Sequence, residues 1–536
     1  MNDAGIPDVN LLNWILAFSP IAVLLVLMVG FNWGGAKAGP AAWLTAFAVS
    51  ILAFGGGTSL LAYSQVKGAL LSAWVLYIIW AALLLFHIVD EAGSIKTIGQ
   101  GIARITGNRV MQLILLSWIF TTFLQGIAGY GVPVAVVAPL MVGMGFSPVV
   151  AVVATSIGHS WSVTFGSLAA SYFALSGVSE IPGAELAFES AMLLGLACFL
   201  CGFGAVWSYG AWIALRQAII PLTIVGTIMA STQFGMVSLG TYPLAAFTAG
   251  CLGLLAISAL ARIPVYRHYR PESDPDRQAT EAVEVATSVV PLKEILLAFA
   301  AYIILVVIVL SASFIGPIED TLSTGSIRLG FPVTMTDFGW VNEATDSYRT
   351  IQIFGDAGAL LLYACALGYL LYRVTGKLET GAWKRIGSRT LAGALTSSVG
   401  IVTMVGMALI MLDSGMTFML ARGSVDVAGP IFPLISPLVG VLGTFMTGSN
   451  TNSNILFGAL QRDSAVLLGL PPALLLAAQT AGGALGSMLA PAKIIVGCST
   501  VGLSGKEGPV LRQGARYGLV ITMILGVTVL IWSWFV

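Results

Sequence analysis

Long apolar runs separated by short polar segments dominate the chain. Three of the clearest runs are 11-LLNWILAFSPIAVLLVLMVGF-31, 70-LLSAWVLYIIWAALLLFHIV-89 and 517-YGLVITMILGVTVLIWSWFV-536. Each reaches the roughly 20 residues that a helix needs to cross about 30 Å of hydrocarbon. Repeated along the sequence, the pattern predicts an all-α polytopic membrane protein with about 12–14 transmembrane helices in a single integral membrane domain, residues 1–536.

Composition strengthens this prediction, because 57% of the 536 residues are hydrophobic and only 9% are charged. A soluble protein carries about 25% charged residues, so a soluble fold of this size could not cover its surface. The formal net charge is +0, and nothing in the charge pattern points to nucleic acid as a partner. Cys198 and Cys201 form a C-x-x-C pair inside an apolar run with no second ligand pair nearby, which favours core packing. We therefore expect no bound metal and no cofactor.

Charged residues gather between the apolar runs and predict how the chain is oriented. The loops 263–291 and 373–389 are rich in Lys and Arg, and the positive-inside rule places both in the cytoplasm. The loop 317–350 carries more Asp and Glu than Lys and Arg, which favours the extracytoplasmic side. The short connections elsewhere leave no room for a soluble catalytic domain.

Two regions, 110–175 and 428–497, interrupt the apolar pattern with Gly, Pro, Ser, Thr and Asn at matching positions. Each has a polar break, a Gly-containing turn that ends in Pro, and a second polar break. In the first region these segments are 125-QGIAGYGVP-133, 145-GFSP-148 and 158-GHSWS-162. In the second region they are 447-TGSNTNSN-454, 469-GLPP-472 and 482-GGALGS-487. Short, interrupted segments at corresponding positions of two halves point to the binding site of a transporter. The reason is that unpaired backbone groups are tolerated at membrane depth only inside protein or along a cavity. We predict a re-entrant hairpin and a broken helix in each half; the alternative is that both breaks are turns at the membrane interface.

Around these breaks the sequence resembles the lactate permease family. The blocks that carry the resemblance are 123-FLQGIAGYGVPVAV-136, 145-GFSPVVAV-152, 446-MTGSNTNSNILFGALQ-461, 477-AAQTAGGALGSMLAP-491 and 500-TVGLSGKEG-508. The resemblance extends over most of the chain and implies secondary transport of L-lactate, with D-lactate and glycolate, by proton symport at the cytoplasmic membrane. It also implies two inverted-repeat halves, an elevator-type mechanism and a homodimer.

The chain departs from the family pattern at five positions. Gln125 and Asn450 stand where an acid is usual, and His159 stands where an amide is usual. Lys493 replaces a small polar residue, and Asp413 replaces an amide. The coupling ion therefore stays open between a proton and Na⁺.

A small hydroxycarboxylate brings one negative charge and one hydroxyl, so its site needs N–H groups, hydroxyls or a cation in place of water. The N-termini of broken helices supply oriented N–H groups and a partial positive charge. The substrate-binding residues that we predict are Gly126, Gly129, Tyr130, Gly131, His159, Ser160, Ser449, Asn450, Thr451, Asn452, Asn454 and Lys493. The ion-coupling residues that we predict are Gln125, His159, Asp413 and Asn450, with Ser449, Asn450 and Thr451 as the alternative Na⁺ site.

Two ionisable residues keep more than one interpretation. Lys493 could bind the carboxylate, pair with Asp413, or extend its ammonium to the membrane interface. His159 could carry the proton or be a hydrogen-bonded histidine that packs helices together. For residues 447–454, the alternative to contact with substrate or ion is helix capping alone.

Two other classes of membrane protein fit the residues less well. An intramembrane enzyme needs a Ser/His, Asp/Asp or His-Glu metal constellation, and the 3 histidines have no partner with the H-E-x-x-H spacing. A proton-translocating subunit of a larger complex needs charged residues along several helices, for which Asp413 and Lys493 are too few. We therefore predict a transporter whose partners are a small organic anion, a co-transported proton or Na⁺, and the lipid bilayer.

Overall fold

The computed structural model describes residues 5–31, 33–103, 105–129, 131–181, 183–267, 291–348, 350–504 and 506–536. These described residues are mostly helical, and they contain 12 helical spans that are long and apolar enough to cross a membrane. Two shorter apolar helices, Val132–Gly143 and Pro148–Ser160, accompany them. The prediction of a polytopic helical membrane protein is thereby confirmed.

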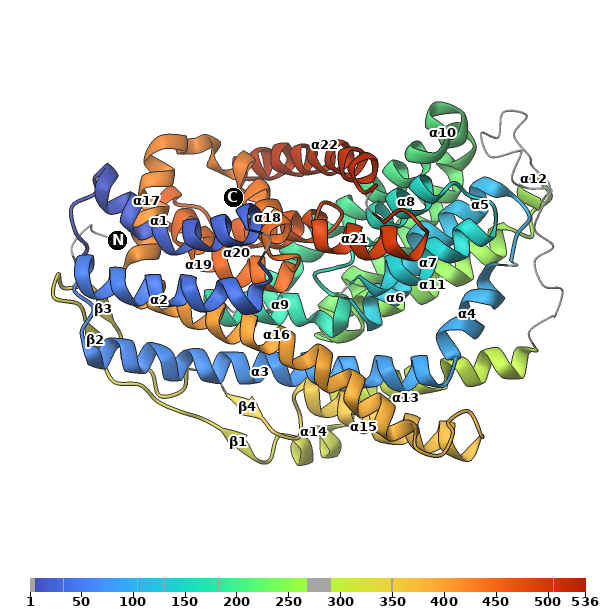
Figure 1. The fold of residues 1–536 in the computed structure, drawn as a ribbon, viewed down its shortest axis with the longest axis horizontal. Helices are drawn as coiled ribbons and strands as arrows, with labels where there is room; N and C mark the ends of the chain where they lie inside the picture. The colour runs from blue at the N-terminus through green and yellow to red at the C-terminus, as the bar shows by residue number, and fades with distance from the viewer. Residues whose placement is uncertain are drawn as a thin grey trace.

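One group of helices, which we call the scaffold, lies along one side of the molecule (Figure 1). Its two longest members lie side by side, α3 (Thr58–Glu91) and α16 (Ala382–Asp413). The other members are α1 (Leu11–Leu25) with the π-helical η1 (Val26–Gly30), α2 (Gly35–Ala53), α13 (Leu292–Phe314) and α15 (Ala357–Val374). Three short helices outside the group are α4 (Ser94–Ala103), α12 (Pro264–Arg267) and α14 (Gly316–Leu322).

The second group is built around two helical hairpins, which we call hairpin 1 (residues 109–143) and hairpin 2 (residues 432–468). Hairpin 1 and its continuation comprise α5 (Arg109–Leu113), η2 (Ile114–Phe120), α6 (Thr121–Ile127), α7 (Val132–Gly143), α8 (Pro148–Ser160) and α9 (Gly166–Ser179). Hairpin 2 and its continuation comprise α18 (Phe432–Thr447), α19 (Asn450–Leu468), α20 (Pro472–Gly486) and α21 (Pro491–Thr500). Around them lie α10 (Gly183–Ser238), η3 (Tyr242–Leu244), α11 (Ala245–Leu260), α17 (Met416–Ala428), η5 (Gly429–Ile431) and α22 (Gly508–Trp532).

Each hairpin reverses direction at a glycine in the left-handed region. In tip 1, residues 128–131, Gly131 has a φ of 87°. In tip 2, residues 447–454, Gly448 has a φ of 71° and Ser449 then begins α19 as its N-cap. Glycine adopts this conformation without the steric cost that a side chain imposes. The polar breaks at 125–133 and 447–454 therefore contain the turns of two helical hairpins; that these hairpins are re-entrant stays a prediction.

The helix after each hairpin packs back against the hairpin's first arm. A Cβ on Gly158 of α8 would overlap the carbonyl oxygen of Ser117, and a Cβ on Gly482 of α20 would overlap that of Pro437. These close approaches explain why glycine stands at both positions. Each of these helices then ends in an irregular segment, residues 161–165 after α8 and residues 487–490 after α20. The second break thus begins after Gly482, which lies inside a helix, contrary to the boundary expected from the sequence.

The interrupted backbone is enclosed by protein. In the most apolar 18-residue stretch of the span Arg109–Ile127, 94% of residues are buried, and in that of Pro472–Thr500 the share is 100%. In the outer span Leu11–Gly30 it is only 28%. Gly129 and Gly131 of tip 1 and Asn450 and Asn454 of tip 2 are buried as well, as irregular backbone at membrane depth requires; the depth of the tips in the membrane stays a prediction.

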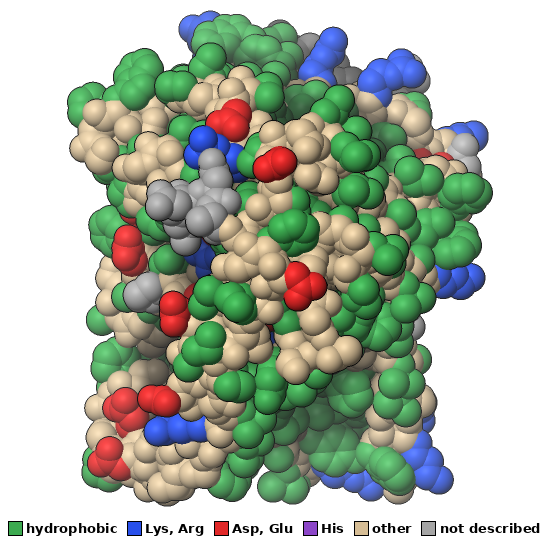
Figure 2. All heavy atoms as spheres, turned by 90° about the vertical axis from the view of Figure 1, so that its left-hand side faces the viewer, with side chains coloured by type: hydrophobic (Ala, Val, Ile, Leu, Met, Phe, Trp, Pro, Cys, Tyr) green, Lys and Arg blue, Asp and Glu red, His purple; other side chains and the backbone are tan. Residues whose placement is uncertain are grey.

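The two ends of the molecule correspond to the two predicted sides of the membrane. In Figure 1, α12 and the α15–α16 connection lie at the right-hand end, together with α4. The N-terminal region and the strands β2 (Thr334–Met335) and β3 (Val341–Asn342) lie at the left-hand end, and Figure 2 shows Asp and Glu side chains spread over that face. Residues 268–290 of the predicted cytoplasmic loop 263–291 lie outside the described residues.

The segment between α14 and α15 departs from an all-α fold. It contains two small antiparallel sheets, in which β1 (Ser326–Ile327) pairs with β4 (Ile351–Gln352) and β2 (Thr334–Met335) pairs with β3 (Val341–Asn342). The departure has a physical reason, because backbone groups outside the hydrocarbon can bond to water and need no helix.

Candidate functional site

Side chains from both interrupted regions meet at tip 2. Asn450 Nδ2 donates to Thr164 Oγ1 at 3.2 Å and to Thr480 Oγ1 at 3.4 Å. Asn454 Nδ2 donates to Thr480 Oγ1 and to the carbonyl oxygen of Ser171, both at 2.9 Å. The start of α19 is thereby tied to α20, to the break after α8 and to α9.

Helix capping accounts for part of the polar character of tip 2. Ser449 Oγ accepts a hydrogen bond from the backbone N–H of Asn452 at 3.4 Å, as an N-cap residue does. The Thr451 and Ser171 hydroxyls are 2.9 Å apart and join tip 2 to α9. These contacts hold the hairpin tip in place.

Capping does not account for the three asparagines. The Oδ1 atoms of Asn450, Asn452 and Asn454 are buried, and no group in the described parts of the chain donates to them. A buried acceptor that loses its hydrogen bond costs about 1–3 kcal/mol. Asn450 and Asn454 lie one turn apart on one face of α19, so their two oxygens are suited to a ligand that supplies hydroxyl or ammonium protons, or to a cation.

Tip 1 is packed on one side. A Cβ on Gly126 would lie 2.5 Å from Phe247 Cα, so Gly126 allows close contact between α6 and α11. A Cβ on Gly129 would overlap Ser167 Oγ at the start of α9. Both glycines therefore serve packing in this structure. Tyr130 lies outside the described residues.

The backbone beside tip 1 is strained. Ser167, Leu168 and Ala169 have φ values of 47°, 58° and 64°, a run of left-handed residues without a glycine. Such conformations cost of order 1–3 kcal/mol each and cluster at functional sites. Gln125 packs against the same turn through Gly166, and its Oε1 is buried with no hydrogen-bond partner in the described structure.

The end of α8 places His159 in the interior with only 1% of its surface exposed. Its Nδ1 lies 2.8 Å from the carbonyl oxygen of Thr155. A carbonyl oxygen only accepts, so Nδ1 carries the proton, and in the neutral ring Nε2 is then a bare acceptor. Nε2 is buried and has no partner within the described chain. Ser160 by contrast donates to the Ser156 carbonyl oxygen at 2.7 Å, inside its own helix.

Both tips converge on the first turn of α21. A Cβ on Gly131 would lie 4.0 Å from Lys493 Cγ, and a Cβ on Gly448 would lie 3.7 Å from Ala492 Cβ. The ammonium of Lys493 donates to Ser487 Oγ at 3.0 Å, in the break between α20 and α21. The side chain is partly buried. The first turn of α21 therefore lies between the two tips, and its Lys493 lies beside tip 1 and the second break.

The electrostatics of this convergence favour an anion. Helix α7 begins at tip 1, α19 begins at tip 2, and α21 begins beside Lys493. A helix N-terminus carries a partial positive charge and unpaired N–H groups. Together with a lysine ammonium, these helix ends can hold a carboxylate by charge and by hydrogen bonds.

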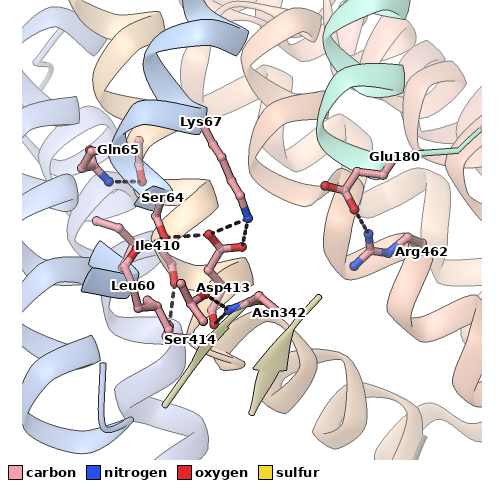
Figure 3. A network of polar contacts seen from close by, with 12 residues as sticks. Leu60, Ser64, Gln65, Lys67, Glu180, Asn342, Ile410, Asp413, Ser414 and Arg462 are labelled. Carbon is pink, nitrogen blue, oxygen red and sulfur yellow. Dashed lines mark hydrogen bonds and ion pairs between the residues drawn. The ribbon is translucent and has the colours of Figure 1, made fainter. Parts of the chain in front are cut away.

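Asp413 lies in a different place, at the end of α16 in the scaffold (Figure 3). Its carboxylate accepts from Ser64 Oγ at 2.7 Å and pairs with the ammonium of Lys67 at 3.4 Å. Its carbonyl oxygen accepts from Asn342 Nδ2 at 2.9 Å. Asp413 therefore pairs with Lys67. It does not pair with Lys493, which was one of the possibilities that the sequence left open.

Two aromatic rings of the loop 317–350 lie over this pair. The Lys67 ammonium lies 5.7 Å from the centre of the Phe331 ring and 5.6 Å from that of Tyr348. Figure 3 also shows Arg462 of α19, whose guanidinium lies 3.6 Å from the carboxylate of Glu180 at the end of α9. This contact joins hairpin 2 to α9.

A family model described as L-lactate permease matches residues 13–536. The chain belongs to the L-lactate permease family. Among its relatives, the L-lactate permease of Bacillus subtilis (strain 168) is 26% identical over 96% of this chain and 97% of its own. The L-lactate permease of Escherichia coli (strain K12) is 27% identical over 96% of this chain and 95% of its own. The glycolate permease GlcA of the same strain is 24% identical over 97% of this chain and 95% of its own.

Membership of the L-lactate permease family, with the 12 spans among the described residues, identifies a multi-pass transport protein of the cytoplasmic membrane. In this permease-family chain, the structure adds residues that the sequence interpretation missed: Thr164, Ser171, Thr480 and Ser487 at the tips, and Lys67 in the scaffold. The tip residues lie within or beside the quoted blocks, where their place among apolar neighbours was the available signal. Lys67 is a cation inside a long apolar helix, a pattern that indicates a functional or paired charge.

Proposed function

We propose that this protein is a secondary active symporter that carries a small 2-hydroxymonocarboxylate, such as L-lactate, D-lactate or glycolate, across the cytoplasmic membrane together with protons. The names of the relatives support the substrate class. The observation that carries the proposal is the convergence of both hairpin tips on the first turn of α21, which carries Lys493.

Each part of the substrate has a partner in this arrangement. The carboxylate binds the Lys493 ammonium and the N–H groups at the helix ends. The 2-hydroxyl donates to a buried amide oxygen of tip 2, such as Asn450 Oδ1, which has no donor elsewhere in the described structure. A site with unpaired buried polar groups discriminates strongly against ligands that lack the matching hydroxyl.

His159 is the proposed proton carrier. Its Nε2 is a buried acceptor without a donor in the described chain, so it is the atom of the ring that can take up a proton. The alternative coupling ion is Na⁺, which prefers oxygen ligands as hard cations do. The unpaired Oδ1 atoms of Asn450, Asn452 and Asn454 favour that alternative.

An elevator mechanism with two inverted-repeat halves is part of the proposal. Its support is the reciprocal packing of the two regions, in which α9 packs on α19 while α21 packs on α7. The flanking helices follow the same pattern, since α10 packs on α20 while α22 packs on α8. The scaffold would then stay fixed while the hairpin region moves. A homodimer, implied by the family resemblance, stays a prediction.

Uptake of labelled lactate into proteoliposomes tests the function. We expect saturable uptake that an inward proton gradient stimulates and an inward Na⁺ gradient does not. Stimulation by Na⁺ alone would replace the proton with the alternative ion. Uptake insensitive to both gradients would contradict symport, and no saturable uptake of lactate or glycolate would contradict the substrate class.

A further inference from the structure

A cavity lies between the scaffold and tip 1, next along the chain to Gly126, Gly129 and Gly131, and neither Lys493 nor tip 2 lines it. Its volume is about 150 Å³, roughly ten times the 10–15 Å³ that one water needs. The scaffold contributes Phe86 and His87 from α3, and Arg389 and Gly393 from α16. Hairpin 1 contributes Ile127 and Ala128.

The charged wall of the cavity belongs to the scaffold alone. The Arg389 guanidinium lies 2.7 Å from Asp90 and 3.6 Å from Glu91, both near the end of α3. His87 Nδ1 lies 2.9 Å from Thr390 Oγ1, which also joins α3 to α16. These contacts fix two cation-capable side chains at the cavity. The opposite wall, from hairpin 1, carries apolar side chains.

The position of the cavity relates it to one side of the membrane. Arg389 and His87 lie near the end of the scaffold that carries the α15–α16 connection, which is the predicted cytoplasmic end (Figure 1). The cavity wall at Ile127 and Ala128 is the last turn of α6 and the start of tip 1. An anion that leaves tip 1 toward the cytoplasm therefore meets Arg389.

We propose that this cavity is a second, cytoplasm-facing binding site for the transported monocarboxylate, with Arg389 as its carboxylate-binding residue. The guanidinium has five donors, so it can bind the ligand carboxylate in exchange for its contact with Glu91, the longer of its two, while it keeps Asp90. Phe86, Ile127 and Ala128 contact the ligand's apolar carbon atoms. The site rests on the proposed function for the identity of its ligand.

Transport measured from each side of the membrane tests the second site. Inside-out and right-side-out vesicles carrying the wild type or Arg389→Gln would be compared for their half-saturating lactate concentration. For Arg389→Gln we expect this concentration to rise about tenfold from the cytoplasmic side, corresponding to ~1.4 kcal/mol, and to stay unchanged from the other side. Arg389→Lys, which keeps the charge but loses the planar fork, should show a smaller rise.

Arg385→Gln is the matched control. Arg385 lies on the same helix and pairs with Glu91 at 2.6 Å, but it does not line the cavity. We expect it to leave both half-saturating concentrations unchanged. An equal rise from both sides in Arg389→Gln, or the same rise in Arg385→Gln, would overturn the second site and indicate a weakened α3–α16 contact. An unchanged Arg389→Gln in a transporting wild type would overturn the site alone, whereas a wild type without saturable transport would contradict the proposed function.

Discussion

At the scale of single residues, the candidate site is made of amides, hydroxyls and one lysine. Asn450 is central, because its Nδ2 joins Thr164 and Thr480 while its Oδ1 is left without a donor in the described structure. In the proposed site, an amide at this position offers the substrate hydroxyl an acceptor without adding negative charge. A neutral tip suits an anionic substrate that Lys493 must attract.

Replacing Asn450 by Asp tests this reasoning. A carboxylate at tip 2 would repel the substrate, so the half-saturating lactate concentration of Asn450→Asp should rise about tenfold or more at neutral pH. Protonation would remove the repulsion, so the defect should shrink as the pH falls. Uptake kinetics at two pH values, with Asn13→Asp near the N-terminus as the control, measure the effect. A half-saturating concentration equal to that of the wild type would show that Asn450 does not face the anion.

The sequence identifies polar residues that stand out in apolar surroundings, but it gives little information about which residues they contact. Tip 2 stands out because amides rarely occur in hydrocarbon without a role. Ser171 and Thr480 escape notice, because Ser and Thr in membrane helices commonly bond to their own helix backbone. The Lys67–Asp413 pair could not be read from sequence, since its members are 346 residues apart.

At the scale of elements, two devices join segments that are distant in sequence. One is the pair of breaks and hairpin tips, which the matching Gly and Pro positions predict. The other is the Lys67–Asp413 pair, which joins α3 to the end of α16 beside Phe331 of the loop 317–350. Exposed fractions of 10% and 7% place both side chains away from water. The pair therefore holds two helices of the scaffold together.

Breaking this pair should destabilise the scaffold. Asp413→Ala leaves the Lys67 ammonium buried without a counter-charge, a change that costs about 3–5 kcal/mol. The double variant Lys67→Met with Asp413→Leu should recover most of the lost stability, because it removes both charges. Glu379→Gln is the control. The Glu379 side chain pairs with Arg385 but is 84% exposed, so this ion pair should contribute little to the stability of the protein. Thermal unfolding in detergent measures the stability of all three variants. An Asp413→Ala variant as stable as the wild type would show that the Lys67–Asp413 pair does not stabilise the scaffold.

At the scale of the whole molecule, the fold brings two distant regions of the sequence to one place. The apolar runs and their breaks predict the helices and the hairpins, because hydrocarbon allows few alternatives. They do not predict that the first turn of α21 lies between the two tips, because this position depends on how α7, α19 and α21 pack against one another. The small sheets of the extracytoplasmic loop escape prediction for the opposite reason, because water permits many backbone conformations.

The central claim is that the two tips and Lys493 form one carboxylate site. Its most direct test is the binding of lactate to the purified protein, measured by calorimetry for the wild type, Lys493→Ala and Lys506→Ala. Lys506 is an exposed lysine beyond α21 and controls for the loss of one positive charge. We predict saturable binding by the wild type and by Lys506→Ala, with binding to Lys493→Ala weaker by about tenfold or more, or ~1.4 kcal/mol. Equal affinity of Lys493→Ala and the wild type for lactate would contradict the claim.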